Sequence, residues 1–264
     1  MIASLGMYDP RWLQGANDAL WAGLARHLRD QGLGAVPESL TRDRPLDAIW
    51  TAPDLLLAQT CGYPLTMQLG NAVRPVATLA YDAPGCEGAW HRSALVVRRD
   101  DPAQDLGALR GRRVAINARD SNTGMNLLRH AVTPIAKGAR AFVQVIETGA
   151  HARSVMAVAG GRADLAAIDA VTLALLHDRY PGLARRLRVL GWTAPSPGLP
   201  LITAADGPVE PLRAALAAML ADPSLADARR ALRMVGMQVL DRSDYAVIPA
   251  MAREAAAAGY PDLA

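Results

Sequence analysis

The segment Arg113-Val-Ala-Ile-Asn117-Ala-Arg-Asp-Ser121-Asn-Thr-Gly124 joins a short apolar run, a polar turn and the start of a helical pattern. The apolar run predicts a buried strand, and the residues after the turn predict a helix. The hydroxyls of Ser121 and Thr123 and the amide of Asn122 then lie beside unpaired N–H groups at the positive end of a helix. That combination binds an oxyanion without a lysine. The alternative is a plain helix cap, formed by Ser121 or Asn122.

A second turn of the same form is Glu147-Thr-Gly-Ala-His151, between a predicted strand and a predicted helix. His151 stands near the helix start, where the dipole disfavours a protonated imidazole unless an anion offsets it. A purely structural histidine is the alternative. Asp169 ends the apolar run Leu165-Ala-Ala-Ile-Asp169, at the sheet edge where parallel α/β folds bind ligands. Its alternative role is to cap the helix that starts at Ala170.

Strands and helices alternate along the whole chain. Apolar runs predict strands over residues 2–7, 47–50, 73–81, 93–99, 113–117, 142–147, 164–169 and 187–192. Helical spacing of apolar residues predicts helices over residues 16–31, 54–60, 121–131, 150–159, 170–177, 208–222, 225–235 and 245–258. This alternation is typical of the α/β class with mostly parallel sheets.

Two stretches rich in proline and glycine, residues 82–88 and 194–200, divide the chain. Two such crossings predict a central lobe that is inserted into an outer one. We therefore expect a discontinuous first lobe of residues 1–84 and 194–264. Residues 85–193 would form the second lobe, which carries both polar turns.

Composition excludes several classes of protein. The 264 residues suffice for nearly two domains, and 51% hydrophobic with 20% charged residues is typical of a globular chain. No stretch is long and apolar enough for membrane insertion. The net charge is +3 and Lys137 is the only lysine, so no basic stripe predicts a nucleic-acid partner. No phosphate-loop, dinucleotide or zinc motif predicts a cofactor or metal. Whether Cys61 and Cys86 pair stays open.

Several ordered motifs resemble one known family, the phosphate, phosphite and phosphonate substrate-binding proteins of ABC transporters. They are Trp90-His-Arg-Ser-Ala-Leu-Val-Val-Arg-Arg-Asp-Asp-Pro102, Leu109-Arg-Gly-Arg-Arg-Val-Ala-Ile-Asn117, Ser121-Asn-Thr-Gly124, Glu147-Thr-Gly-Ala-His151 and Ala157-Val-Ala-Gly-Gly-Arg-Ala-Asp-Leu-Ala-Ala-Ile-Asp169. The resemblance covers residues 47–203. It implies a two-lobed type II periplasmic-binding-protein fold, whose lobes close over a small anionic ligand, and an ABC permease as partner.

The resemblance also implies a ligand site. In the family the polar turn and the following helix N-terminus hold the phosphonate oxygens. Ser121 and Thr123 match the hydroxyl positions and Gly124 follows them, whereas Asn122 stands where a hydroxyl residue is usual. His151 matches the histidine of the Thr-Gly-x-His turn. We predict that these side chains share one anion site, because both turns would leave neighbouring parallel strands at the same sheet edge.

Two further positions extend the implied site. Asp169 matches an acidic position that faces the other end of the ligand, and His91 stands where an aromatic residue, usually tyrosine, precedes the hinge-strand serine. With His91 and Asn122 in these places, a phosphate-like oxyanion or a small carboxylate is as compatible as phosphonate.

The first lobe offers aromatic and amide side chains at strand ends and turns: Tyr8, Trp50, Gln59 and Tyr81. Such side chains provide an apolar wall with hydrogen-bonding tips, which suits a ligand with an organic portion. We expect them to line the cleft between the lobes; ordinary core or hinge packing is the alternative.

The preferred function is a solute-binding protein for transport or sensing, a monomer or weak dimer. The first residues contain no basic side chain before Arg11 and no apolar h-region, so no signal peptide is predicted. The chain as it stands would be cytoplasmic, and periplasmic if an upstream export signal has been removed. An enzyme on the same scaffold is the alternative, similar to menaquinone-pathway enzymes, with His151, Asp169 or Glu147 as general acid or base. The effector domain of a regulator is disfavoured, because no helix-turn-helix segment precedes residue 1.

Overall fold

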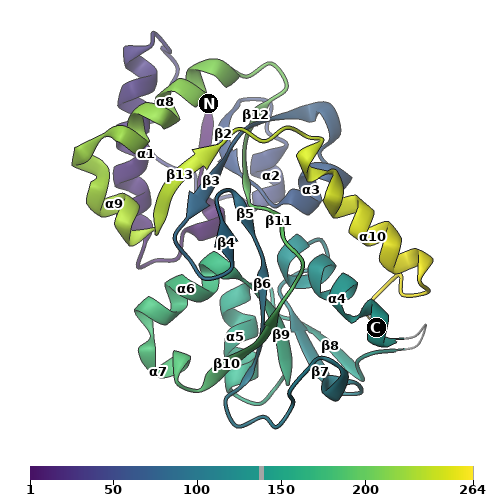
Figure 1. Cartoon of the computed structure of the whole chain (residues 1–264). Coiled ribbons are helices and arrows are strands. Elements are labelled where there is room, and N and C mark those ends of the chain that lie inside the picture. Colours follow the sequence, from purple (N-terminus) through teal and green to yellow (C-terminus); the bar gives the residue numbers. More distant parts are fainter. Residues whose placement is uncertain (137–139, 264) are drawn as a thin grey trace. The chain divides into compact units, whose positions relative to one another are not determined.

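The protein folds into two compact units, as a computed structural model of the chain shows (Figure 1). The structure describes residues 1–136 and 140–263, so Lys137 lies outside the described residues. Unit 1 consists of Met1–Asp82, Glu87–Ala89 and Pro197–Tyr245. Unit 2 consists of the described residues of Ala83–Cys86, Trp90–Ser196 and Ala246–Ala264.

Unit 1 is built on a five-stranded sheet in the order β1-β2-β12-β3-β13. Its strands are β1 (Ile2–Ser4), β2 (Leu55–Gln59), β3 (Val73–Tyr81), β12 (Pro200–Ala204) and β13 (Met234–Gln238). β1 runs parallel to β2, and the other neighbouring pairs are antiparallel. The sheet is therefore mixed.

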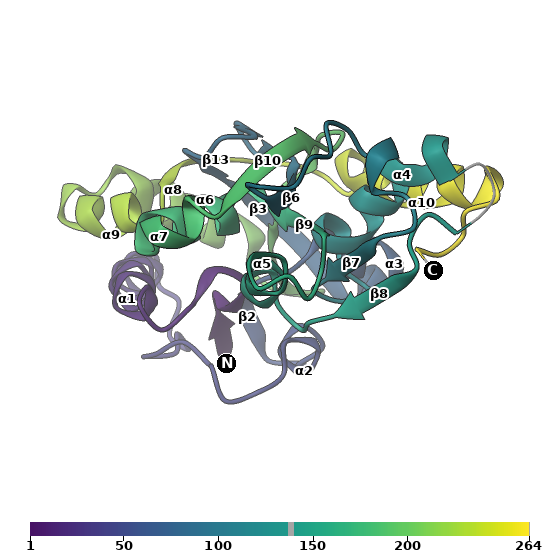
Figure 2. The ribbon, with the colours of Figure 1, turned by 90° about the horizontal axis from the view of Figure 1, so that it is seen from below.

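Helices cover this sheet on both sides. They are α1 (Gln14–Asp30), α2 (Leu46–Trp50), α3 (Gly62–Met67), α8 (Val209–Ala221) and α9 (Ala226–Ala231). Figures 1 and 2 show α1, α8 and α9 on one side of the strands and α2 and α3 on the other. Helix α1 forms because Leu20, Leu24 and Leu28 recur every four residues, and this stripe is buried.

Unit 2 is built on a second five-stranded sheet in the order β10-β6-β9-β7-β8. Its strands are β6 (Ser93–Arg98), β7 (Arg113–Ile116), β8 (Gln144–Glu147), β9 (Leu165–Asp169) and β10 (Leu187–Trp192). β7 runs parallel to both β8 and β9, whereas β6 is antiparallel to β9 and β10. The three parallel strands end at one edge, and this edge carries the polar turns.

The helices of unit 2 are α4 (Leu127–Ala136), α5 (His151–Ala159), α6 (Ala170–Arg179), α7 (Pro181–Ala184) and α10 (Val247–Ala257). Seen from below, α5 and α6 lie on one side of the sheet, and α4 lies on the other with α10 beside it (Figure 2). Short strands β4 (Cys86–Glu87), β5 (Trp90–His91) and β11 (Ser196–Pro197) pair in the order β11-β5-β4.

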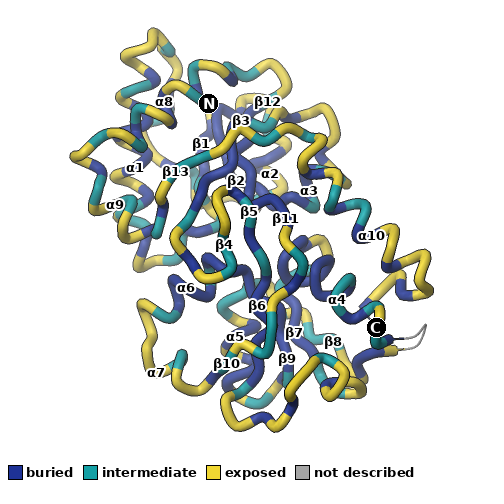
Figure 3. Tube along the Cα trace, in the orientation of Figure 1, coloured by how far each residue is buried: buried dark blue, intermediate teal, exposed yellow. Residues whose placement is uncertain are grey.

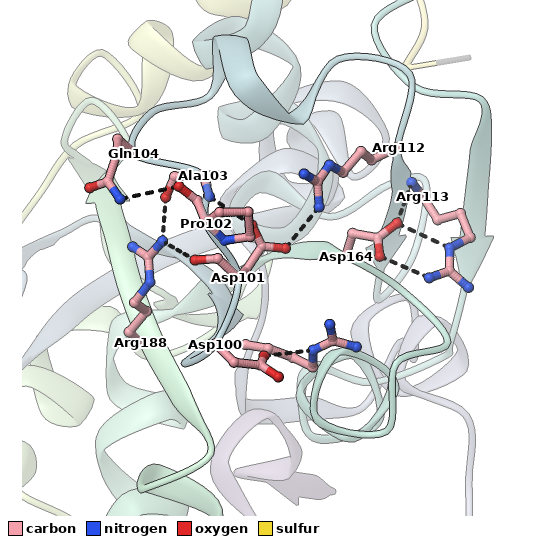
Figure 4. Close-up of polar contacts among 10 residues, drawn as sticks. Asp100, Asp101, Pro102, Ala103, Gln104, Arg112, Arg113, Asp164 and Arg188 are labelled. Carbon is pink, nitrogen blue, oxygen red and sulfur yellow. Dashed lines mark hydrogen bonds and ion pairs between the residues drawn. The ribbon is translucent and has the colours of Figure 1, made fainter.

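The inner strands β2, β6, β9 and β12 are almost entirely buried, and the outer faces of the helices are exposed (Figure 3). Ion pairs stabilise the ends of the unit 2 strands that lie opposite the polar turns (Figure 4). The Asp101 carboxylate lies 2.9 Å from an Arg112 nitrogen, and the Arg113 guanidinium donates two hydrogen bonds, of 3.0 and 2.8 Å, to Asp164. Among the described helices, none combines the length and the apolar character needed to cross a bilayer.

Two predicted elements at residues 47–60 are wrong in type. The expected strand over 47–50 is the one-turn helix α2, and the expected helix over 54–60 is strand β2. The run Leu55–Gln59 is buried at every position because β1 and β12 flank it on both edges. A short, uniformly apolar run carries no periodicity that separates a central strand from a buried helix.

The expected helix over 225–235 is also incomplete. Helix α9 ends at Ala231, and residues 234–238 form edge strand β13 after Arg233, which adopts a φ of 55°. Together with β12, this strand makes the unit 1 sheet largely antiparallel rather than mostly parallel. The α/β class itself is confirmed.

The C-terminal residues differ from the expected division of the chain. We expected residues 194–264 to join the first lobe, but residues 246–263 belong to unit 2. Helix α10 packs on α4, and the Asn126 amide donates a 3.2 Å hydrogen bond to the Ile248 carbonyl. The Arg129 guanidinium also donates to the Pro261 carbonyl. These bonds satisfy buried polar groups that the sequence pattern does not reveal.

Candidate functional site

The first polar turn follows β7 and leads into a π-helical turn, Asn122–Asn126. Ser121 has an extended backbone, and its hydroxyl oxygen accepts a 3.0 Å hydrogen bond from the Gly124 N–H group. Ser121 therefore caps this helical turn, which was the alternative role predicted for it. Its hydroxyl hydrogen is still available for donation. Single π-helical turns concentrate at functional sites in proteins.

The second polar turn follows β8 and leads into α5. Gly149 has a φ of 82°, a conformation that favours glycine, and the next residue, Ala150, is extended and provides no side-chain cap. The first N–H groups of α5 therefore have no side-chain acceptor in their own cap. His151 is the first residue of this helix.

Thr123 and His151 join the two turns. The Thr123 hydroxyl lies 2.9 Å from the His151 Nε2 atom, within hydrogen-bonding distance. The contact exists because β7 and β8 are parallel neighbours, with Ile116 paired to Glu147 at the ends of the two strands. Thr123 is itself 3% exposed, and its carbonyl accepts a 2.8 Å bond from the Ser93 hydroxyl.

Gly124 permits a close approach of the first turn to Asn117. A Cβ atom at Gly124 would lie 1.7 Å from the Asn117 Oδ1 atom and 3.1 Å from the His151 Cε1 atom. Asn117 Oδ1 is buried and accepts no hydrogen bond from the described residues. The Asn117 amide therefore adds a hydrogen-bond acceptor next to Gly124, close to the His151 ring.

His91 and Asp169 form a second polar pair in unit 2. The His91 Nδ1 atom lies 3.2 Å from Asp169 Oδ2, and the side chains are 4% and 2% exposed. Asp169 Oδ1 also accepts a 2.8 Å hydrogen bond from the Thr172 N–H group. Asp169 therefore caps α6, which was the alternative role predicted for it. Its carboxylate is thus engaged inside unit 2.

Burial controls the protonation of both histidines. Burial lowers the pKa of His91 below its usual value, although the Asp169 carboxylate opposes this effect. Burial likewise lowers the pKa of His151, with Asp169 opposing the shift and His91 reinforcing it. Both imidazoles are therefore mainly neutral at neutral pH in this structure.

The Asn122 amide is engaged within unit 2. Its Nδ2 atom donates a 2.8 Å bond to the Ser196 hydroxyl, and its Oδ1 accepts a 3.1 Å bond from Asn126 Nδ2. The residue is 1% exposed. The Asn122 amide therefore supports the π-helical turn from within, and its donation to an anion stays a prediction.

The four candidates of the first lobe lie together in unit 1. The Trp50 indole donates a 3.0 Å bond to the Gln59 carbonyl, and the Gln59 amide donates a 3.2 Å bond to the Tyr81 hydroxyl. The rings of Tyr8 and Tyr81 pack edge to face, with centroids 5.3 Å apart. Trp50, Gln59 and Tyr8 are buried, so packing within unit 1 accounts for much of their surface.

Sequence reasoning missed three residues that shape the unit 2 site: Asn117, Ser93 and Ser196. The position of Asn117 directly after a buried strand is a usable signal. The Ser93 hydroxyl donates to the Thr123 carbonyl, and the Ser196 hydroxyl accepts from the Asn122 amide. Both serines are far from the turn in sequence, so no local pattern could identify these contacts. Among the described residues, no group of three or more histidine, cysteine or acidic side chains is arranged to hold a metal ion.

Solved structures show the same fold at low sequence identity. A binding-protein component of an ABC phosphonate transporter from Pseudomonas aeruginosa aligns with 97% of this chain and 86% of its own, at 14% identity and a TM-score of 0.76. PhnD1 from Prochlorococcus marinus, in complex with methylphosphonate, aligns over 96% of both chains, at 14% identity and a TM-score of 0.70. A protein from Xanthomonas citri bound to ATP aligns over 97% of this chain and 96% of its own, at 17% identity and a TM-score of 0.70.

No curated protein matches the sequence. Residues 53–245, most of the chain, match the family described as the periplasmic substrate-binding protein of the phosphonate ABC transporter. The members are substrate-binding proteins rather than enzymes, which confirms the preference for binding over catalysis. On this match, the chain belongs to the phosphonate ABC transporter substrate-binding protein family.

Proposed function

We propose that this solute-binding protein takes up a small oxyanion at the two polar turns of unit 2 and delivers it to an ABC permease. The ligand classes are phosphonates, phosphate-like oxyanions and small carboxylates. Family membership supports a small ligand and a permease partner. The choice of an oxyanion rests on the residues of the turns.

The observation that carries the proposal is the 2.9 Å contact between the Thr123 hydroxyl and His151 Nε2. If Nε2–H donates to the Thr123 oxygen, the hydroxyl hydrogen is left to be donated to an oxyanion. His151 would then orient Thr123. The first N–H groups of the π-helical turn and of α5 are further donors beside the same point.

The electrostatics of the turns favour a small anion. Two helical segments direct their positive ends toward the place where Thr123 and His151 meet, each equivalent to roughly half a positive charge. Burial lowers the pKa of His151, so the imidazole contributes as a neutral hydrogen-bonding group until an anion arrives. An anion would raise that pKa again by favouring the charged ring.

Calorimetric titration with methylphosphonate, phosphate and acetate tests the proposal. Thr123→Ala removes a hydrogen bond to the anion, and His151→Ala removes the side chain that orients the Thr123 hydroxyl, so affinity should fall about ten- to a hundred-fold in each variant. Thr123→Ser keeps the hydroxyl and should retain most of the affinity. Thr51→Ala and His130→Ala are matched controls, because their side chains bond to the Asp47 carbonyl and to Glu254 near the surface.

The proposal fails if none of the three anions binds the parent protein. It also fails if an anion binds equally well to the parent and to both Thr123→Ala and His151→Ala. Tight binding of methylphosphonate with weak binding of acetate would narrow the ligand class to phosphonates and phosphates.

A further inference from the structure

Unit 1 contains a pocket that the proposed function does not use. Its volume is about 250 Å³, below the usual range of drug-sized sites, so it suits a small metabolite. The polar part of its lining includes Ser4, Gln14, Thr41 and Arg44. All of them belong to unit 1: Ser4 ends β1, Gln14 begins α1, and Thr41 and Arg44 lie between α1 and α2.

Four polar groups of this lining lack hydrogen-bond partners. Ser4 is 3% exposed, yet its hydroxyl bonds to no described residue. The same holds, within the described part of the chain, for the Thr41 hydroxyl, the Gln14 amide and the Arg44 guanidinium. Because the Ser4 hydroxyl lines the pocket, a ligand inside the pocket can form a hydrogen bond with it.

One of the two arginines in the pocket lining forms no ion pair with a described residue. The Arg42 guanidinium lies 2.5 Å from an Asp9 oxygen and 2.8 Å from an Asp18 oxygen, which neutralises it. Asp9 also accepts a 2.9 Å bond from Asn17 and is thereby fully engaged. Arg44 is the remaining cation of the described lining. A guanidinium pairs well with a carboxylate through two parallel hydrogen bonds.

We propose that this pocket binds a small hydroxycarboxylic acid as its monoanion. The carboxylate pairs with Arg44, and the hydroxyl groups bond to Ser4, Thr41 and Gln14. The apolar side chains of Leu46 and Ile49 contact the carbon chain. A phosphate ester fits less well, because its second negative charge would face Asp9.

Calorimetry with D-glycerate is the direct test, with two matched probes. Propanoate has the carboxylate without the hydroxyls, and glycerol has the hydroxyls without the carboxylate. Glycerate should bind at least ten times more tightly than either, since each probe loses one half of the contacts. Amide shifts in an NMR titration should concentrate at Gly6, Thr41 and Arg44.

Variants separate a ligand site from a structural role. Arg44→Gln and Ser4→Ala should each weaken glycerate binding about tenfold or more without lowering thermal stability, since neither side chain has a partner to lose. Arg11→Gln is the control for removal of an exposed arginine of unit 1. In Gly6→Ala the new Cβ would meet Leu46 Cδ2 at 2.8 Å, and because both residues line the pocket, the displacement of Leu46 should also weaken binding.

In Thr123→Ala the glycerate-induced amide shifts of Gly6, Thr41 and Arg44 should remain, whatever glycerate binds at the unit 2 turns, which keeps this proposal separate from the anion site of unit 2. The proposal is overturned if millimolar glycerate does not bind, or if it binds no better than propanoate and glycerol. Unchanged binding in both Arg44→Gln and Ser4→Ala, or amide shifts confined to the unit 2 turns, would overturn it as well.

Discussion

At the scale of single residues, Gly124 sets the shape of the first turn. The Asn117 amide occupies the space that a Cβ atom would need, at 1.7 Å from its position. Gly124→Ala should therefore destabilise the protein by about 1–3 kcal/mol and displace Thr123 from His151. Urea unfolding and oxyanion titration measure the two effects.

Gly15→Ala is the matched control for that change. Gly15 lies near the start of α1 with no atom within 4 Å of an added Cβ, so alanine should be neutral or stabilising by up to about 1 kcal/mol. Normal stability and affinity in Gly124→Ala would contradict the close packing described for the turn.

The protonation of His91 and His151 makes stability depend on pH. Burial lowers both pKa values in the folded state, so below about pH 6.5 the unfolded chain binds more protons. Stability is fully present above that pH and should decrease as the pH falls, by about 1.4 kcal/mol per pH unit for each proton bound on unfolding. The pKa of His177 is also lowered by burial, and it adds to the same effect.

Urea unfolding at pH 7.5, 6.5 and 5.5 checks this dependence. His91→Gln should flatten the profile, whereas Thr51→Ala, which changes an exposed side chain that carries no titrating group, should leave it unchanged. A parent protein that gains stability from pH 7.5 to 5.5 would show that the sign is wrong.

The chemistry of the site could be predicted from single residues better than its geometry. Thr123 and His151 each stand directly after a strand and a small-residue turn, and the parallel pairing of β7 and β8 brings them together as expected. Asn122 looked equivalent to its neighbours, but it points inward to Ser196. That orientation depends on a residue far along the chain, which no local pattern contains.

At the scale of elements, the π-helical turn and α10 are held by one buried side chain. Asn126 is fully buried, and its amide donates to Asn122 and Ile248 while its oxygen accepts from Arg129 at 3.1 Å. Asn126→Ala leaves these groups without partners, so stability should fall by about 2–4 kcal/mol. Oxyanion affinity should fall with it, because the turn loses its internal support.

Thermal unfolding and proteolysis of residues 246–263 measure the effect of Asn126→Ala. Thr133→Ala, which removes a hydroxyl bonded only to the Arg129 carbonyl on α4, should cost much less. Equal stability losses in the two variants would show that Asn126 has no special role in fastening α10.

The type of an element could be predicted where its sequence pattern was long, and the prediction was wrong where the pattern was short. The 17-residue helix α1 and the nine-residue strand β3 show clear periodicity or β-branched residues and agree with the prediction. Strand β2 and helix α2 are five residues each, and their types were exchanged. Burial from neighbouring strands decides the conformation of such runs, and that information is not local.

At the scale of the whole molecule, ligand binding should stabilise the two units differently. An oxyanion at about 100 times its dissociation constant adds roughly 2.7 kcal/mol of stability to the fold that binds it. Hydrogen exchange should therefore slow in residues 117–126 and 148–154 when methylphosphonate is added. Core strands of unit 1, such as β2, provide the internal comparison. Uniform slowing, or slowing confined to unit 1, would contradict a ligand site at the unit 2 turns.

Strand β12 has a consequence for synthesis on the ribosome. It lies between β2 and β3, with Leu201 paired to Gln59 on one side and Ala77 on the other. The first 82 residues therefore emerge from the ribosome with a gap in the middle of their sheet, and they keep it until residues 200–204 have followed. Unit 2 is likewise incomplete until α10 has been synthesised, because α10 follows its other described helices and strands in the chain. Neither unit can be completed from a single contiguous stretch of nascent chain, so contacts distant in sequence control the folding rate, and the incomplete sheet needs protection from aggregation in the meantime.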